Sequence, residues 1–218
     1  MTRKKTCMSK SGKAARAAYG TYSRNREEAA RQTREAILTA AQKLFAAQGY
    51  ATTGINQIAN VTGISRQTFY LHFSSKIEVL DQLIETFEQG VMILYEELAA
   101  IVRPDLALLS QWTTRFLAFC EADQKTVLLL LGTVPVEVDL AQDRADRYQR
   151  ILTLLGQRHK PFSIAASGED AGMRGRAVSL LAQVESLPRL AITAVPLCDK
   201  QSLITALAEN LLAFLERD

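Results

Sequence analysis

The sequence predicts an all-α protein of two parts, and three observations lead to that prediction. Apolar residues recur at spacings of three and four through most of the chain, as they do along one face of a helix. Residues that favour helix starts and ends separate these segments. No alternating apolar and polar run bounded by hairpin signals indicates a strand. A chain of 218 residues can bury one large or two modest cores.

The first helix is expected over residues 26–48. Its apolar residues fall at i, i+3, i+4, i+7 and i+8, and they are Ile37, Ala40, Ala41, Leu44 and Phe45. Gly49 follows at the position where glycine commonly ends a helix.

Two short helices joined by a tight turn are expected next. The first spans 54–61, where a threonine can act as the N-cap. Gly63 provides the left-handed turn, and Ser65 is a good N-cap for a helix over 65–72. This is the helix-turn-helix arrangement, whose second helix normally enters the major groove of DNA.

A long helix over 76–102 follows, because Ser75 and Glu78 stand at capping-box spacing. Only helices are expected beyond it, with breaks near Pro135, around Pro161–Gly168 and at Pro196. They are predicted over 105–122, 125–133, 136–159, 169–193 and 200–216.

Charge is distributed unevenly along the chain. Residues 1–76 hold 13 Lys and Arg against 3 Asp and Glu, whereas residues 77–218 hold 13 against 20, so the two parts carry +10 and −7 within a net charge of +3. A strongly basic segment indicates a nucleic acid or an anionic membrane surface as partner, because neutralised phosphates release counterions. Residues 1–25 have seven basic residues, no acidic residue and no helical stripe. We interpret them as a basic flexible arm, for which a merely solvated tail is the alternative.

The apolar segments and the cysteines indicate where in the cell the protein is expected. No apolar segment follows the basic start as in a secretion signal, and no apolar run approaches the roughly 18 residues of a membrane span. Cys7, Cys120 and Cys198 form neither a CxxC pair nor a disulfide framework. We expect a cytoplasmic protein that does not enter a membrane.

The region from Gly49 to Lys76 resembles the N-terminal signature of the TetR family of transcriptional regulators. The matching positions are Gly49-Tyr50, Thr53, Ile58-Ala59, Gly63-Ile64-Ser65, Thr68-Phe69-Tyr70, His72-Phe73 and Ser75-Lys76. The rest of the chain resembles the family only in its length and expected helices. The resemblance implies a three-helix DNA-binding domain at 26–76 and a ligand-binding and dimerisation domain at 77–218. It further implies a sequence-specific homodimeric regulator, a repressor that a small-molecule inducer releases from operator DNA.

The resemblance implies seven candidate DNA contacts: Thr53, Arg66, Gln67, Thr68, Tyr70, His72 and Lys76. Arg66 and Gln67 are of the types that read guanine and adenine edges. Thr68, Tyr70 and His72 fall where the family commonly touches the backbone or base edges. Thr53 and Lys76 are expected at helix N-termini, where backbone N–H groups favour a phosphate.

Three further positions in this region are informative. Gly54 stands where the family often has a hydroxyl residue, and Ile77 stands where it usually has an acid. Leu71 has no hydrogen-bonding group, so it either touches a thymine methyl or fills space. The basic arm is longer than in most members, and it can follow the minor groove or the backbone.

Family members generally hold an inducer among their C-terminal helices and dimerise through the last two. The candidate lining combines large apolar side chains with a few polar tips: Met92, Tyr95, Trp112, Phe116, Phe119, Cys120 and Tyr148. For any one of them an ordinary core position is the alternative. The last helix is apolar over more of its surface than one domain face covers, so Leu203, Leu207, Leu211 and Phe214 are expected at a dimer interface.

Two other classes of protein fit the sequence less well. His72 and His159 are the only histidines, neither belongs to an HExxH or Cys/His cluster, and no nucleotide-binding or nucleophile motif stands at a strand-to-helix turn. We therefore expect no enzyme activity, metal or cofactor. A nucleoid-type or membrane-surface protein shares the basic charge but not the ordered motif, and would bind DNA without sequence preference.

Overall fold

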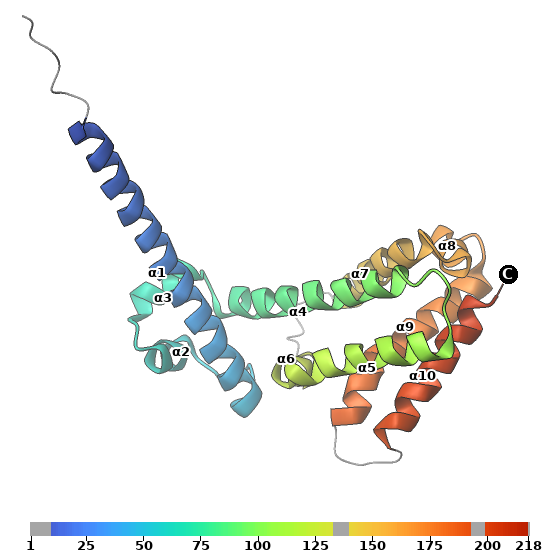
Figure 1. Cartoon of the computed structure of the whole chain (residues 1–218). Helices are drawn as coiled ribbons and strands as arrows, with labels where there is room; N and C mark the ends of the chain where they lie inside the picture. The colour runs from blue at the N-terminus through green and yellow to red at the C-terminus, as the bar shows by residue number, and fades with distance from the viewer. Residues whose placement is uncertain (1–9, 133–139, 193–198, 218) are drawn as a thin grey trace, which may run out of the picture.

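A computed structural model of the chain describes residues 10–132, 140–192 and 199–217. All regular secondary structure in these residues is α-helical (Figure 1). The helices are α1 (Lys10–Gln48), α2 (Ile55–Thr62), α3 (Arg66–His72), α4 (Lys76–Ala99), α5 (Leu106–Ala122), α6 (Gln124–Gly132), α7 (Leu140–Gly156), α8 (Lys160–Ser167), α9 (Ala171–Ile192) and α10 (Lys200–Leu215). The all-α prediction is confirmed, although the expected breaks at Pro135 and Pro196 lie outside the described residues.

Two expectations about secondary structure were wrong. Residues 10–25, interpreted as part of a flexible arm, form the first turns of α1. Alanine, lysine and arginine are strong helix formers, and extending an existing helix avoids the cost of nucleation. The expected break at Pro161–Gly168 is mostly the short helix α8. Pro161 stands in its first turn, where no backbone N–H is needed, and Gly168 ends it at φ 78°.

Helices α1 to α4 share a small N-terminal core. Its buried members include Ile37 and Phe45 of α1, Ile58 of α2, and Phe69 of α3. Leu129 of α6 belongs to the same core, so a helix of the C-terminal part also packs into the N-terminal one.

Helix α4 belongs to both parts of the molecule (Figure 1). Val79 and Leu80 are buried in the N-terminal core, whereas Leu94, Tyr95 and Leu98 are buried in the C-terminal core. The expected domain boundary at residue 76 therefore coincides with the start of α4, but the change from one core to the other occurs along α4 itself.

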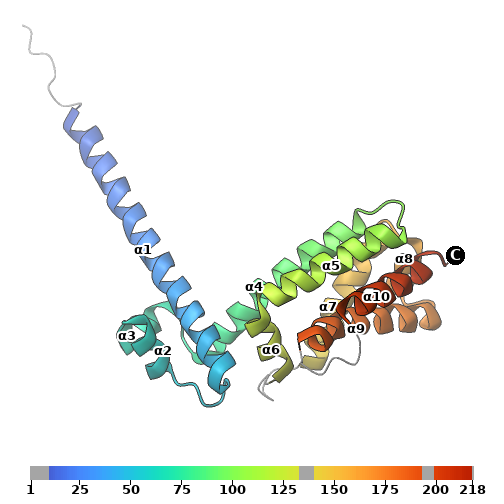
Figure 2. The ribbon, with the colours of Figure 1, turned by 60° about the horizontal axis from the view of Figure 1, so that its bottom comes forward.

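The C-terminal core is formed by α4, α5 and α7 to α10, with Val127 of α6 buried in it as well (Figure 2). Helix α10 packs chiefly on α5, and α8 packs against both α7 and α9. Two capped starts orient these helices: Asp105 accepts a hydrogen bond from Leu108 N, and Asp199 accepts one from Ser202 N. Among the described helices none is long and apolar enough to cross a membrane.

Candidate nucleic-acid interface and C-terminal cluster

Two glycines stand at the ends of α2, and the second of them begins the turn to α3. Gly54, not a threonine as expected, is the N-cap of α2, and its N–H donates to Gln57 Oε1 at 2.7 Å. Gly63 has the predicted left-handed conformation, at φ 69°. Its neighbour Ile64 then donates its N–H to Ala59 O at 3.0 Å, which closes the turn. A tight turn of this kind holds α3 at a fixed angle to α2.

Helix α3 separates its residues into a buried face and an exposed face. Ser65 caps the helix as predicted, by accepting a 2.9 Å hydrogen bond from Thr68 N. Phe69 is fully buried and anchors α3 in the N-terminal core. On the other face Tyr70 is 45% exposed and Leu71 79% exposed. Leu71 therefore does not fill space inside the domain, and its side chain is available to a partner.

The first turn of α3 presents two polar side chains to solvent. Arg66 and Gln67 are both exposed. Arg66 Nη2 donates to Tyr70 Oη at 3.1 Å, and its guanidinium lies 5.5 Å from the centre of the Tyr70 ring. The Arg66 side chain is thus held along the exposed face of α3 without a carboxylate partner in the contacts observed.

Arg34 of α1 was not singled out from the sequence, yet it holds the C-terminal end of α3. Its Nη1 donates to His72 O at 2.5 Å and its Nη2 donates to Gln82 Oε1 at 3.0 Å. The guanidinium also lies 3.9 Å from the centre of the Phe73 ring. These contacts join α1, α3 and α4, so Arg34 is a positioning residue. Only tertiary contacts reveal this role, since nothing in the local pattern around Arg34 is unusual.

Two of the predicted phosphate contacts have structural partners inside the protein. The Thr53 side chain is 2% exposed, and its hydroxyl donates to Gly49 O at 2.8 Å and accepts from Gln48 Nε2 at 3.1 Å. This burial contradicts an exposed phosphate contact by the Thr53 side chain. The hydroxyl instead stabilises the turn that ends α1.

Lys76 is also engaged within the domain. Its ammonium donates to Tyr50 O at 2.6 Å and to Thr53 O at 2.8 Å, and it lies 4.1 Å from the centre of the Tyr50 ring. Burial lowers the pKa of this ammonium. Lys76 therefore ties the start of α4 to the loop before α2, and it has a third N–H for any external acceptor.

The seven predicted ligand-pocket residues do lie together in the C-terminal part. Tyr95, Trp112, Phe116, Cys120 and Tyr148 are buried in one core, and the partly buried Met92 and Phe119 pack against it. The Trp112 ring is stacked 5.4 Å from the Phe116 ring, and its Nε1 donates to Leu94 O at 2.6 Å. These side chains are a largely aromatic part of the C-terminal core, and the alternative of ordinary core positions describes their observed packing.

Gly90 permits the close contact between α4 and α5 at one side of this cluster. A Cβ at Gly90 would lie 2.4 Å from Cζ of Phe119. The Phe119 ring in turn lies 5.4 Å from the Phe87 ring of α4. Glycine fits at this position inside α4 because a larger residue would displace the Phe119 ring.

A charged group connects α4, α7 and α9 beside the cluster. Arg147 pairs with Glu88 Oε1 at 2.5 Å and with Glu185 Oε1 at 2.8 Å. Tyr148 donates its hydroxyl to Glu185 Oε2 at 2.6 Å. Burial and this neighbouring carboxylate raise the pKa of Tyr148 well above its usual range. The phenol therefore stays a hydrogen-bond donor at neutral pH.

The four residues expected at a dimer interface pack inside the chain itself. Leu207, Leu211 and Phe214 are at most 4% exposed and Leu203 is partly buried against the same core. The broad apolar surface of α10 is explained by three neighbours, α5, α8 and α9, which cover it. The burial of Leu207 and Leu211 contradicts their place at an interface, whereas for Leu203, which is partly buried, and Phe214, which also lines the groove between α9 and α10, the interface stays a prediction.

The opposite face of α9 and α10 forms an open groove of about 530 Å³. It is lined mainly by small and polar residues, with two arginines: Ala171, Gly172, Gly175, Arg176, Ser179, Leu180, Gln183, Asn210, Ala213, Phe214 and Arg217. None of the seven predicted ligand-pocket residues lines it. In the described part of the chain, no group of three His, Cys, Asp or Glu side chains is placed to hold a metal ion.

These features define a helix-turn-helix protein with a helical C-terminal domain. Residues 37–83 match the model for bacterial regulatory proteins of the tetR family. The likeness to this family therefore concerns the helix-turn-helix region and the start of α4.

Curated relatives are similar over part of the chain. One is the uncharacterized HTH-type transcriptional regulator TtgW of Pseudomonas putida, 30% identical over 93 residues, which are 43% of this chain and 64% of the relative. Another is the HTH-type transcriptional regulator AcrR of Shigella flexneri, 32% identical over 68 residues, or 31% of this chain and 32% of the relative. The alignments thus span less than two thirds of these relatives.

Solved structures share the fold over most of the chain. NalD, the secondary repressor of the MexAB-OprM multidrug efflux pump in Pseudomonas aeruginosa, is 22% identical with a TM-score of 0.63, over 88% of this chain and 99% of that one. The SmeT–triclosan complex is 24% identical with a TM-score of 0.63, over 84% of this chain and 91% of that one. At this identity the likeness concerns the fold alone.

Proposed function

We propose that the protein is a dimeric transcriptional repressor that reads operator DNA with α3 and leaves it when a small molecule binds the C-terminal domain. One observation carries the proposal. The residues of α3 that the fold does not use for packing, Arg66, Gln67, Tyr70 and Leu71, form one exposed face in a domain of a DNA-binding family.

Each exposed side chain has a suitable role on DNA. Arg66 and Gln67 stand in the first turn of α3, the part of a recognition helix that contacts base edges, and they suit guanine and adenine. Leu71 suits a thymine methyl group. Thr68, Tyr70 and His72 carry hydroxyl and imidazole donors for phosphates, and the free N–H of Lys76 is a further one.

Dimerisation follows from the short reach of one recognition helix. A single α3 contacts only a few base pairs, whereas a two-fold dimer presents two copies to an inverted repeat. Because Leu207 and Leu211 are internal, we place the dimer contact on the other face of α9 and α10, which lines the open groove. Small residues such as Gly175, Ser179 and Ala213 on this face allow close approach of helices from a second copy.

The ligand is proposed to bind among the aromatic residues around Trp112, and two observations support this placement. The cluster packs against the C-terminal half of α4, while the N-terminal half of α4 belongs to the core that carries α3. A ligand that separates Phe119 from Gly90, or Tyr148 from Glu185, would shift α4 and with it the two α3 helices of the dimer. The related fold of SmeT is known in complex with triclosan.

The DNA-binding proposal is tested by selecting bound duplexes from a random pool. We expect an inverted repeat to be enriched. Arg66→Ala and Gln67→Ala should each weaken binding to it by about 1–3 kcal/mol, or about 5- to 150-fold, and relax base preference at one position per half-site. Arg103→Ala, an exposed change beyond α4, is the matched control and should change neither. Failure to enrich any sequence would contradict the proposal.

The ligand proposal is tested through the only tryptophan of the chain, Trp112. Triclosan and other small aromatic probes are titrated while Trp112 fluorescence and release from the selected duplex are followed together. We expect at least one probe to change both signals at the same concentration. Phe116→Ala should shift both curves alike, because Phe116 stacks on Trp112. Fluorescence changes in which no probe affects DNA binding would refute coupling between the cluster and α3.

A further inference from the structure

Helix α1 extends far beyond the domain that it helps to build. Among its side chains described from Arg24 onwards the first buried one is Ile37, whereas the helix begins at Lys10. The described side chains from Arg24 to Gln32 are all exposed. Figures 1 and 2 both show this end of α1 pointing away from α5 to α10, with no other helix beside it. The segment over 10–25 alone is about 24 Å long at 1.5 Å per residue.

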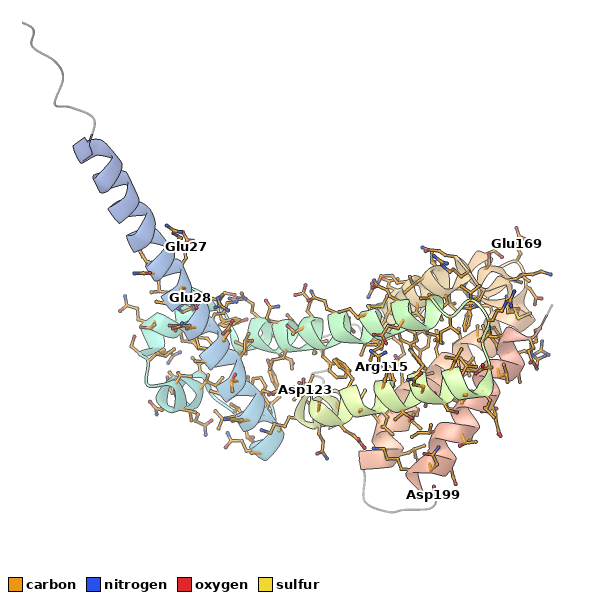
Figure 3. All side chains as sticks on the ribbon, in the orientation of Figure 1. Glu27, Glu28, Arg115, Asp123, Glu169 and Asp199 are labelled. Atoms are coloured by element: carbon orange, nitrogen blue, oxygen red, sulfur yellow. The ribbon has the colours of Figure 1, made fainter. Side chains whose placement is uncertain are left out.

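Charge along α1 changes sharply at Glu27. From Glu27 onwards α1 holds both acidic and basic residues, and Arg31 pairs with Glu28 at 2.7 Å and with Glu35 at 2.8 Å (Figure 3 labels Glu27 and Glu28). Upstream of Glu27 the described helix holds five Lys and Arg residues and no Asp or Glu. Lys10, Lys13 and Arg16 therefore have no acidic residue three or four positions away along α1 with which to form a pair of the kind that Arg31 makes.

This arrangement is unfavourable for an isolated helix. Lys10, Lys13 and Arg16 follow one another at three-residue spacing, which places like charges on neighbouring positions of the helix surface. Cations near a helix N-terminus also oppose the helix dipole. The nearest acidic residue, Glu27, is eleven positions beyond Arg16, or about 16 Å along the axis. A bound polyanion would relieve both penalties at once.

We infer that the segment 10–25 is a rigid helical arm that binds phosphates of DNA flanking the bases read by α3. The inference deepens the proposed function and rests on it. Continuity with the helix-turn-helix domain favours DNA over other polyanions, because α1 and α3 share one core. A helix is about 10–12 Å across and cannot enter a minor groove about 6 Å wide, so the arm contacts phosphates and not bases. Its length corresponds to about seven base pairs at 3.4 Å each.

The first test measures how affinity for a long random-sequence duplex depends on salt. The full chain is compared with a triple variant, Lys10→Gln, Lys13→Gln and Arg16→Gln. Three lost phosphate contacts should reduce the slope of log affinity against log salt by about 2.7 per chain. The control removes three exposed charges from the C-terminal domain, Arg103→Gln, Arg150→Gln and Arg158→Gln. Equal slopes for the triple variant and wild type would overturn the inference.

The second test locates the contact on the duplex. Removing about seven base pairs from each end of a long duplex centred on the selected site should weaken the wild type as much as the triple variant is weakened on the long duplex. The triple variant itself should not respond to the trimming, since the contact is already lost. Additive losses would mean that the charges act elsewhere.

The third test separates a rigid arm from a charged tail. Ala18→Pro keeps every charge but interrupts the helix. We expect it to lose protection of the flanking DNA in hydroxyl-radical footprints while protection of the central site remains. Flanks that stay protected in Ala18→Pro would contradict the rigid arm.

These outcomes are distinguishable from failure of the proposed function. If the arm variants change nothing while Arg66→Ala still loses specificity, only the arm inference fails. If no sequence is selected yet the salt slope still falls in the triple variant, the arm binds DNA and operator recognition fails. Loss of binding to vesicles of anionic lipid in the triple variant, with unchanged binding to DNA, would identify a membrane surface as its partner and overturn the inference.

Discussion

The exposed face of α3 and the apolar face of α10 both carry candidate functional residues, but those on α3 remain in solvent whereas those on α10 are used for packing. On α3 the fold uses Phe69 for packing and leaves Arg66 and Gln67 in solvent. On α10 the fold uses the very leucines that were expected to meet a partner. A polar residue that the core does not need remains available for recognition, whereas an apolar surplus is covered first by the chain's own helices.

The largest expected effect concerns α10. Leu207→Glu with Leu211→Glu would place two charges without partners in the C-terminal core, at about 3–5 kcal/mol each, which is comparable to the whole stability of a domain. We expect loss of the folded state, measured as helical circular dichroism and thermal unfolding. Ala206→Glu, at an exposed position of the same helix outside the groove, is the matched control and should fold normally. A folded, monomeric double variant would return these leucines to a dimer interface.

Lys76→Ala examines a residue that serves both packing and recognition. Loss of its bonds to Tyr50 O and Thr53 O should lower the free energy of unfolding by about 1–3 kcal/mol. Binding to selected and random duplexes should weaken alike, with a flatter salt slope, because a phosphate contact carries no sequence information. Lys43→Ala, an exposed position on α1, is the control for stability. An unchanged salt slope would leave Lys76 with the structural role alone.

Arg147→Ala tests the charged group that connects α4, α7 and α9. The change leaves Glu88 and Glu185 without their shared partner. Since the side chains of Arg147 and the two glutamates are 22–31% exposed, we expect a loss of about 1–2 kcal/mol in urea unfolding. Arg115→Ala breaks a more exposed pair with Glu97 and should cost less, at most about 1 kcal/mol. Equal losses of unfolding free energy in both variants would show that the charged group beside Tyr148 stabilises the domain no more than an exposed ion pair does.

The smallest expected effect is a pH dependence from His159. This side chain is 7% exposed with an unpartnered Nε2, and burial lowers its pKa below 6.5. The folded state therefore favours the neutral ring. The resulting contribution to the free energy of unfolding is complete above pH 6.5 and is lost as the pH falls through 6.5 toward the lower pKa of the folded state. The slope is at most about 1.4 kcal/mol per pH unit. Comparing unfolding of wild type and His159→Gln across this range isolates it; parallel curves would rule it out.

Local sequence determined most of the N-terminal domain. The stripe from Ile37 to Phe45, the left-handed Gly63 and the Ser65 cap each act within a few residues, and the structure contains all three. Side chains that the same region leaves exposed, such as Gln67, follow from the phase of a short helix with one anchor, Phe69. The helix-turn-helix and its exposed face were therefore predictable.

Helices α1 and α8 are the two places where the sequence pattern alone led to the wrong secondary structure. A segment without an apolar stripe was interpreted as a flexible arm, but Lys10 to Asn25 continue a helix that the core around Ile37 has already nucleated. Pro161 was interpreted as a break, although proline also begins helices. In both cases the residues permit two structures, and the neighbouring helix selects one.

Tertiary structure alone decided which faces are internal. The apolar breadth of α10 is the same in the sequence whether α5, α8 and α9 or a second chain covers it, and only the packing shows that the chain covers it itself. The roles of Arg34 and Lys76 likewise depend on carbonyls 38 and up to 26 residues away. Amino-acid order specifies helices and their faces, but burial depends on contacts between residues distant in sequence, because those contacts remove both apolar surface and polar groups from water.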